Sequence, residues 1–111
     1  MVKIIYHRDR HRVSITGHAG GEVGNDLVCA SVTTLAYTLA AFVKNLESSG
    51  QVRYPTVKLD EGDALISCDS ARRYKTAITL VYDSICAGFE LLSSNHPDKI
   101  LYEIRRGESC K

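Results

Sequence analysis

A histidine and a cysteine stand on either side of a glycine-rich stretch near the start of the chain. His18 follows the alternating segment Val13-Ser14-Ile15-Thr16, which predicts a strand with one buried face. Cys29 lies near the start of the apolar segment 27–46, whose spacing is helical. A cysteine in a first helical turn lies near unpaired backbone N–H groups and the positive end of the helix dipole, which favours thiolate over thiol. The two residues could therefore supply a nucleophile and its general base.

The glycines around these two residues could support such a site. Gly17 closes the strand, and Gly20, Gly21 and Gly24 lie between His18 and Cys29. Glycine lets a backbone come close to a bound extended peptide. The N–H groups at the helix start could then hold an oxyanion opposite the attacking sulfur.

A purely structural reading of the same residues stays open. Cysteine is among the most buried residue types, so Cys29 could be a small core hydrophobe. Asn25 or Asp26 could cap the helix, because both side chains accept hydrogen bonds from early backbone N–H groups. We favour this capping role for Asp26 over a direct role in orienting His18.

The motif resembles a known protein family. His18-Ala19, followed by the segment 24–30 (Gly-Asn-Asp-Leu-Val-Cys-Ala), is similar to the signature of the ribosomal-processing cysteine proteases, the Prp or YsxB-like family. The resemblance implies that Cys29 is the nucleophile and His18 its base, and Asp26 matches the family's aspartate. Thr33 and Thr34 stand where family members often carry serine, which is a mild departure.

The resemblance also implies a reaction and partners. It implies a cysteine endopeptidase that removes the N-terminal extension of large-subunit ribosomal protein twenty-seven (bL27) during ribosome assembly, after a phenylalanine-containing sequence. It further implies a homodimer. No cofactor is expected.

Composition bounds the class of protein. The 111 residues are 44% apolar and 24% charged, which is ordinary for one globular domain covering 1–111. The net charge of +1 gives no overall electrostatic case for nucleic-acid binding, so none is expected. No uninterrupted apolar run reaches the length of a membrane span, and the start lacks a signal-peptide pattern. We therefore expect a cytoplasmic protein without membrane contact.

The four cysteines do not suggest a metal site. Cys29, Cys68, Cys86 and Cys110 form no Cys-x-x-Cys pair and have no histidine at zinc-ligand spacing. We expect Cys68 in a strand, Cys86 in a helix core and Cys110 as a tail thiol.

Periodicity predicts the element order ββαββαβ. Strands are expected at 2–6 and 12–17, then a helix at 27–46, and then a hairpin from Pro55 to Cys68 around the turn 60–63. A second helix, capped by Asp69 or Ser70, is expected to bury the stripe Tyr74, Ala77, Ile78, Val81, Ile85, Phe89 and Leu92. A final strand follows at 100–105. These elements predict a two-layer α+β sandwich, with two helices on one face of a mostly antiparallel sheet.

Basic residues gather in two short segments. Arg8, Arg10 and Arg12 flank the first turn, where His7 and His11 are expected to be solvated, and a second group, 72–75, opens the second helix. Most such clusters are solvated surface. They also define the rival function, a non-catalytic ribosome- or RNA-binding module, which would tolerate Cys29→Ala and lose affinity on Arg→Ala.

Overall fold

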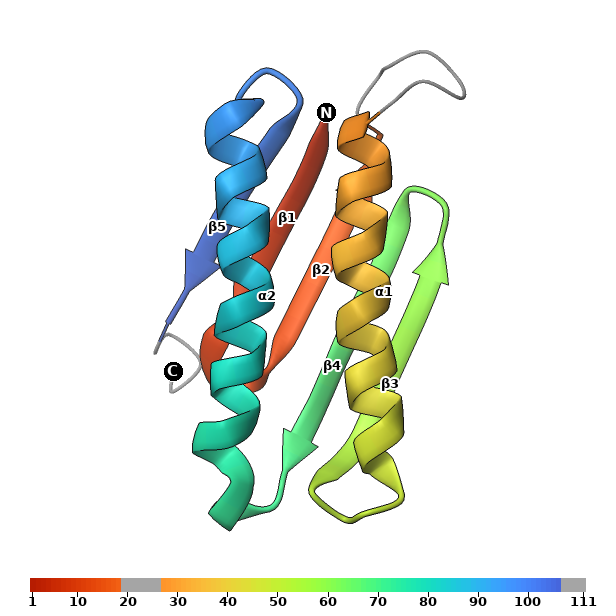
Figure 1. Cartoon of the computed structure of the whole chain (residues 1–111), viewed down its shortest axis with the longest axis vertical. Coiled ribbons are helices and arrows are strands. Elements are labelled where there is room, and N and C mark those ends of the chain that lie inside the picture. Colours follow the sequence, from red (N-terminus) through yellow and green to blue (C-terminus); the bar gives the residue numbers. More distant parts are fainter. Residues whose placement is uncertain (19–26, 107–111) are drawn as a thin grey trace.

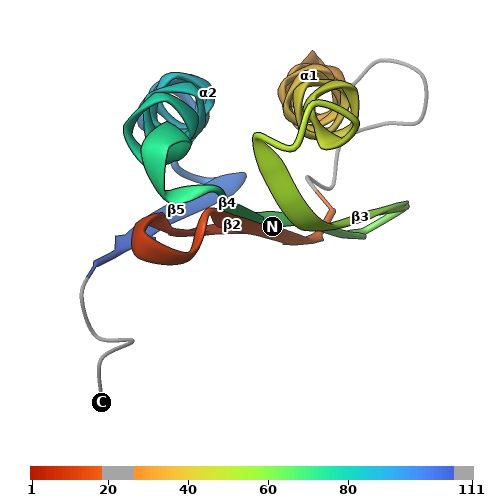
Figure 2. The ribbon, with the colours of Figure 1, turned by 90° about the horizontal axis from the view of Figure 1, so that it is seen from below.

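A five-stranded sheet carries two helices on one face. The computed structural model describes residues 1–18 and 27–106. The strands are β1 (Val2–His7), β2 (Arg12–Gly17), β3 (Val52–Asp60), β4 (Asp63–Ser70) and β5 (Ile100–Arg105), and the helices are α1 (Leu27–Glu47) and α2 (Lys75–Asn95). The strand order is β3-β4-β2-β1-β5, antiparallel except for the parallel pair β1 and β5. Both helices lie on the same side of the sheet (Figures 1 and 2), which confirms the predicted α+β sandwich.

Some element boundaries differ from the predictions. The first turn is the short 3-10 helix η1 (Arg8–Arg10), and β3 begins at Val52 rather than at Pro55. Asp69 and Ser70 do not cap α2, because β4 runs on to Ser70, which pairs with Val52. A 3-10 turn, η2 (Arg72–Tyr74), then leads into α2, and no side chain caps the start of η2 or of α2.

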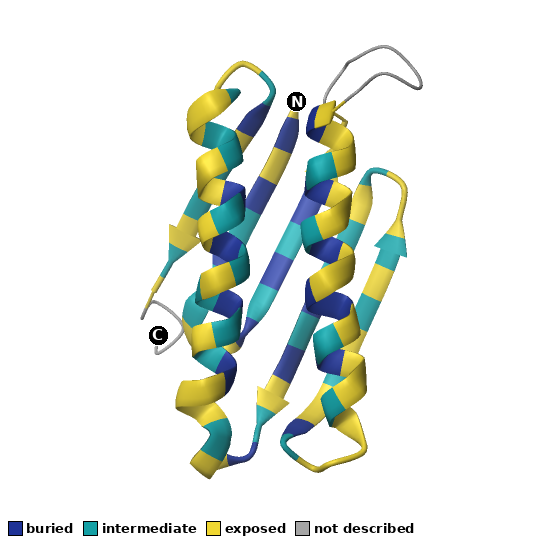
Figure 3. Ribbon diagram, viewed as in Figure 1, coloured by how far each residue is buried: buried dark blue, intermediate teal, exposed yellow. Residues whose placement is uncertain are grey.

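The core lies between the helices and the sheet, where buried positions alternate along β1 and β2 (Figure 3). The helix predicted from the spacing of the segment 27–46 is confirmed, and α1 buries Val28, Val32 and Leu39. The stripe predicted for α2 is partly wrong. The helix buries Ile78, Tyr82, Cys86 and Phe89, whereas Ala77 is exposed. Tyr82 and Cys86 continue the four-residue step from Ile78, so the buried face is rotated from the predicted one.

Both helices are long and apolar enough, by length and composition, to cross a membrane. A core helix of a soluble protein passes the same test. Here both helices bury one face against the sheet (Figure 3), which is the arrangement expected of such core helices.

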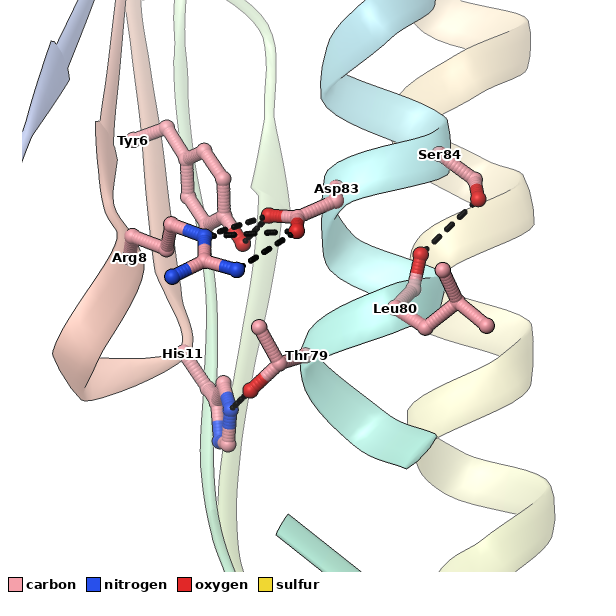
Figure 4. Close-up of polar contacts among 7 residues, drawn as sticks. All are labelled: Tyr6, Arg8, His11, Thr79, Leu80, Asp83 and Ser84. Atoms are coloured by element: carbon pink, nitrogen blue, oxygen red, sulfur yellow. Dashed lines mark hydrogen bonds and ion pairs between the residues drawn. The ribbon is translucent and has the colours of Figure 1, made fainter. Parts of the chain in front are cut away.

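A polar cluster ties the β1–β2 turn to α2 (Figure 4). The Asp83 carboxylate accepts a hydrogen bond from the Tyr6 hydroxyl at 2.7 Å and from the Arg8 guanidinium at 2.9–3.2 Å. The prediction that His11 is solvated is wrong. His11 is 3% exposed, and its Nε2 lies 2.6 Å from the Thr79 hydroxyl. Its ring stacks on the Tyr82 ring, with 5.4 Å between the centroids. The polar residues around His11 in the sequence did not predict this burial.

Candidate active site

His18 and Cys29 line the same pocket, which has a volume of about 300 Å³. His18 directly follows β2, and Cys29 is the third residue of α1. The end of β2, the start of α1 and the β3–β4 turn lie at one end of the molecule, the upper end in Figure 1. The structure therefore brings the two predicted catalytic residues into one cavity.

The packing of α1 turns Cys29 outward. Val28 and Val32 are buried against the core, whereas Cys29 between them is exposed. The reading of Cys29 as a buried core residue is therefore wrong. Its place in the first turn puts the sulfur at the helix end where backbone N–H groups lack helical partners and where the dipole favours an anion. These features suit a thiolate nucleophile.

A backbone hydrogen bond holds the residue that precedes His18 against the β3–β4 turn. The Gly17 N–H donates a hydrogen bond to the Gly62 carbonyl at 3.0 Å, which joins the end of β2 to the β3–β4 turn. Gly17 has a φ of +90°, and a Cβ there would overlap the carbonyl oxygen of Met1. Only glycine satisfies both conditions without rearrangement, which gives a physical reason for the supporting role predicted for Gly17.

The His18 imidazole lies against Gly62 in the β3–β4 turn. A Cβ at Gly62 would lie 2.6 Å from His18 Nε2 and 2.9 Å from its Cε1, so the ring rests directly on the turn. With a φ of +72°, Gly62 also occupies the left-handed region that L side chains rarely adopt. The sequence predicted a turn here but not this contact, because nothing in the local pattern links the turn to a histidine far earlier in the chain.

Four predicted supporting residues lie outside the described residues. These are Asp26, Gly20, Gly21 and Gly24, and the same holds for Asn25 and the tail thiol Cys110. Their predicted roles, including the capping role of Asp26, stay predictions.

The walls of the pocket are mostly apolar and its rim is acidic. The apolar side chains come from the sheet and from α1: Val2, Ile15, Val32, Ala36, Tyr37, Leu59 and Ala64. The rim carries Asp60, Glu61 and Asp63 from the β3–β4 turn. Lys58 Nζ lies 2.6 Å from Asp63 Oδ2 and 3.9 Å from Asp60 Oδ2, so two of these three carboxylates share one ammonium group.

The other described cysteines are placed away from this chemistry. Cys68 lies in β4 and Cys86 in α2, as predicted, and both are almost fully buried. Burial raises the pKa of both thiols, that of Cys86 to about 12. Within residues 1–18 and 27–106, no three His, Cys, Asp or Glu side chains gather as a metal site would require.

Comparisons with known proteins point in one direction. The family model described as cysteine protease Prp matches residues 1–101. A crystal structure of SMU.848 from Streptococcus mutans is similar, with 28% identity and a TM-score of 0.67, covering 96% of this chain and 93% of that one. Comparison with curated proteins gave no match.

The ribosomal processing protease Prp from Staphylococcus aureus has the same fold. Its structure with a covalently linked product peptide has a TM-score of 0.72 and 20% identity, covering 94% of this chain and 97% of that one. A second structure of that protein, with a substrate peptide, gives a TM-score of 0.67. Since the family model spans nearly the whole chain, the protein belongs to the family of the ribosomal-processing cysteine protease Prp.

Proposed function

We propose that the protein is a cysteine endopeptidase in which Cys29 is the nucleophile and His18 the general base. The observation that carries this proposal is the shared pocket, which holds both residues at the start of α1 and the end of β2. Membership of a cysteine protease family supports peptide-bond hydrolysis as the reaction class.

The reaction follows from these two groups. The Cys29 thiolate attacks the scissile carbonyl carbon, and the carbonyl oxygen becomes an oxyanion. The Cys29 backbone N–H and its neighbours at the helix start are the candidate donors to this oxyanion. His18, protonated, gives its proton to the departing amine nitrogen as the peptide bond breaks, which leaves a thioester on Cys29. Water then attacks the thioester, His18 takes the water proton, and the acid product leaves.

The substrate that we propose is the N-terminal extension of bL27. The apolar walls suit an aromatic or aliphatic substrate side chain, such as the phenylalanine that the family resemblance implies near the cut. Tyr37, which lines the pocket, is 55% exposed, and Leu27 at the start of α1 is 79% exposed, so both offer apolar surface to a substrate. A ribosomal processing protease with the same fold supports a ribosomal substrate.

A cleavage assay with product masses tests the proposal. Purified protein is mixed with extended bL27, and Cys29→Ala and His18→Ala are run in parallel. Matched controls are Cys110→Ala, which removes a tail thiol, and His96→Ala, which removes a histidine after α2. We expect one cut in the extension by the wild type and both controls, and none by Cys29→Ala.

Two results would count against the proposal. Cleavage by Cys29→Ala at the wild-type rate would exclude Cys29 as the nucleophile. Equal activity in His18→Ala and His96→Ala would exclude His18 as the base. No cut of bL27, with another ribosomal protein cleaved in a Cys29-dependent way, would retain the mechanism and replace the substrate.

The assembly and location are also proposed. We propose a cytoplasmic homodimer, and the sheet face opposite the helices, which neither helix covers (Figure 2), offers surface for a second copy. Light scattering after gel filtration should give twice the mass of the 12.3 kDa chain. A monomer mass at assay concentrations would contradict the dimer.

A further inference from the structure

A second pocket, of about 280 Å³, lies away from the candidate active site. It forms where the β1–β2 turn, the start of β3, the end of β4 and the start of α2 meet, at the lower end in Figure 1. Its lining residues are Asp9, Arg10, His11, Arg53, Tyr54, Asp69, Ser70 and Lys75. No residue of the first pocket contributes to it.

The pocket gathers basic side chains from three elements. Arg10, Arg53 and Lys75 are all exposed, and they take part in no ion pair among the described residues. Arg72 and Arg73, also exposed, lie in η2, and Tyr74 separates them from Lys75. Asp9 and Asp69 offset part of this charge, yet the region stays positive although the whole chain is nearly neutral. Such a local excess favours a ligand with more than one negative charge.

The aromatic ring of Tyr54 lies beside these charges and is not buried in the core. Tyr54 is 80% exposed and has a φ of +49°, at an irregularity of β3 between Arg53 and Thr56. Among the described residues, only Tyr54 and His11 combine a positive φ with a side chain, and both border this pocket. A left-handed backbone is strained for such residues and marks functional sites more often than ordinary surface. Here it presents an uncovered ring at the edge of a basic pocket.

We propose that this pocket binds single-stranded RNA. Arg10, Arg53 and Lys75 would contact successive phosphates, and a base would stack on the Tyr54 ring. A charged groove with an exposed aromatic side chain is the arrangement by which proteins hold single strands without base-specific contacts. The site goes beyond the proposed protease function. Since the two pockets lie at opposite ends, RNA and a peptide substrate can be bound together.

Fluorescence anisotropy tests the proposal directly. The probe is a fluorescein-labelled single-stranded RNA of about 12 nucleotides, a length within the range that such sites cover. Cys29→Ala is measured beside the wild type and should bind equally, so the result does not depend on protease activity. Three phosphate contacts predict that log affinity falls against log salt with a slope of roughly −2. No binding at low salt would overturn the proposal.

Matched variants locate the site. Arg53→Glu and Lys75→Glu should each weaken binding roughly tenfold, whereas Lys3→Glu, the same charge change at an exposed residue of β1, should have little effect. Tyr54→Gly keeps the left-handed backbone and removes the ring, and it should also weaken binding roughly tenfold. Thermal unfolding checks that each variant is folded.

Two further results would contradict the site or its occupant. An equal loss in Lys3→Glu and Arg53→Glu would show that net charge alone drives binding. Displacement of the RNA by an acidic peptide at equal concentration would make a protein segment the better occupant.

Discussion

At one end of the sheet, His18 and Cys29 line a pocket with apolar walls and an acidic rim, and at the other end basic residues surround an exposed tyrosine. In the first site, His18 and Cys29 come from one short stretch of sequence, and the β3–β4 turn lies beside them. The second comes from four elements that are far apart in the chain. A local motif reveals the first site, whereas the sequence shows only the separate basic segments at Arg10 and 72–75 for the second, and the fold brings Arg10 and Lys75 together with Arg53 and Tyr54.

The two ends also differ in how they are held together. At the basic end, Asp83 binds Tyr6 and Arg8, and His11 packs on the aromatic core beside them. At the pocket end, the contacts that place His18 are backbone ones, from Gly17 and Gly62. We therefore expect substitutions at the pocket end to change catalysis, and substitutions in the polar cluster to change stability.

Outside the Cys29–His18 pair, the largest effect should come from Gly62→Ala. The added Cβ would displace the His18 ring from its position against residue 62. A displacement of a catalytic group by about 1 Å can lower the rate about a hundredfold. The measurement is kcat and KM for cleavage of extended bL27. The matched control is Gly50→Ala, which imposes the same strain, with a φ of +79°, but has nothing within 4 Å of the added atom.

A structural role and a positioning role of Gly62 give different results. Positioning predicts a fall in kcat with a small change in KM, while thermal stability falls as it does in Gly50→Ala. Equal rates in the two variants would show that Gly62 does not position His18.

Asp83→Ala should destabilise the opposite end of the molecule, where Asp83 binds Tyr6 and Arg8. It leaves the buried Tyr6 hydroxyl without its acceptor, which costs about 1–3 kcal/mol of unfolding free energy. Urea unfolding measures this loss, and cleavage at a temperature where the variant is folded should stay near the wild-type rate. A strong loss of kcat without a loss of stability would show that the two ends are coupled.

His11 should make the stability of this end depend on pH. Burial lowers the pKa of His11, Lys75 and Arg8 lower it further, and Asp69 and Asp83 oppose them. The unfolded chain then binds more protons than the folded one as the pH falls below about 6.5. This stabilising contribution is complete above that pH and is lost as the pH falls through the folded pKa, with a slope of at most about 1.4 kcal/mol per pH unit.

His11→Asn tests this dependence, because asparagine tolerates the left-handed backbone of His11 and does not titrate. Unfolding free energies of wild type and variant are compared from pH 7.5 to pH 5. The wild type should lose more stability than the variant over this range. Parallel curves would assign the acid dependence to other groups.

The smallest effect should come from Lys58→Ala. Lys58 is exposed and its pairing with Asp63 is screened by water, so neither the melting temperature nor cleavage should change measurably. A clear loss of cleavage would show that the β3–β4 turn needs this ion pair to support His18.

Much of the fold and the central pair could be predicted from the sequence. Alternation and helical spacing predicted all seven strands and helices, and the Gly-rich stretch pointed to His18 and Cys29, which the fold places in one pocket. The contact of the His18 ring with Gly62 could not be predicted, because it depends on the pairing of β2 with β4. Neither could the burial of His11, since its polar neighbours resemble a solvated turn while its contacts, Thr79 and Tyr82, come from α2.

Covalent labelling tests directly whether His18 activates Cys29. A peptide chloromethyl ketone that matches the proposed bL27 extension is mixed with wild type, His18→Ala and His96→Ala, and the labelled residue is found by mass spectrometry. We expect a single label on Cys29, formed much more slowly in His18→Ala than in the other two proteins. Labelling of Cys110 instead, or an equal rate of Cys29 labelling in all three proteins, would contradict a site in which His18 activates Cys29.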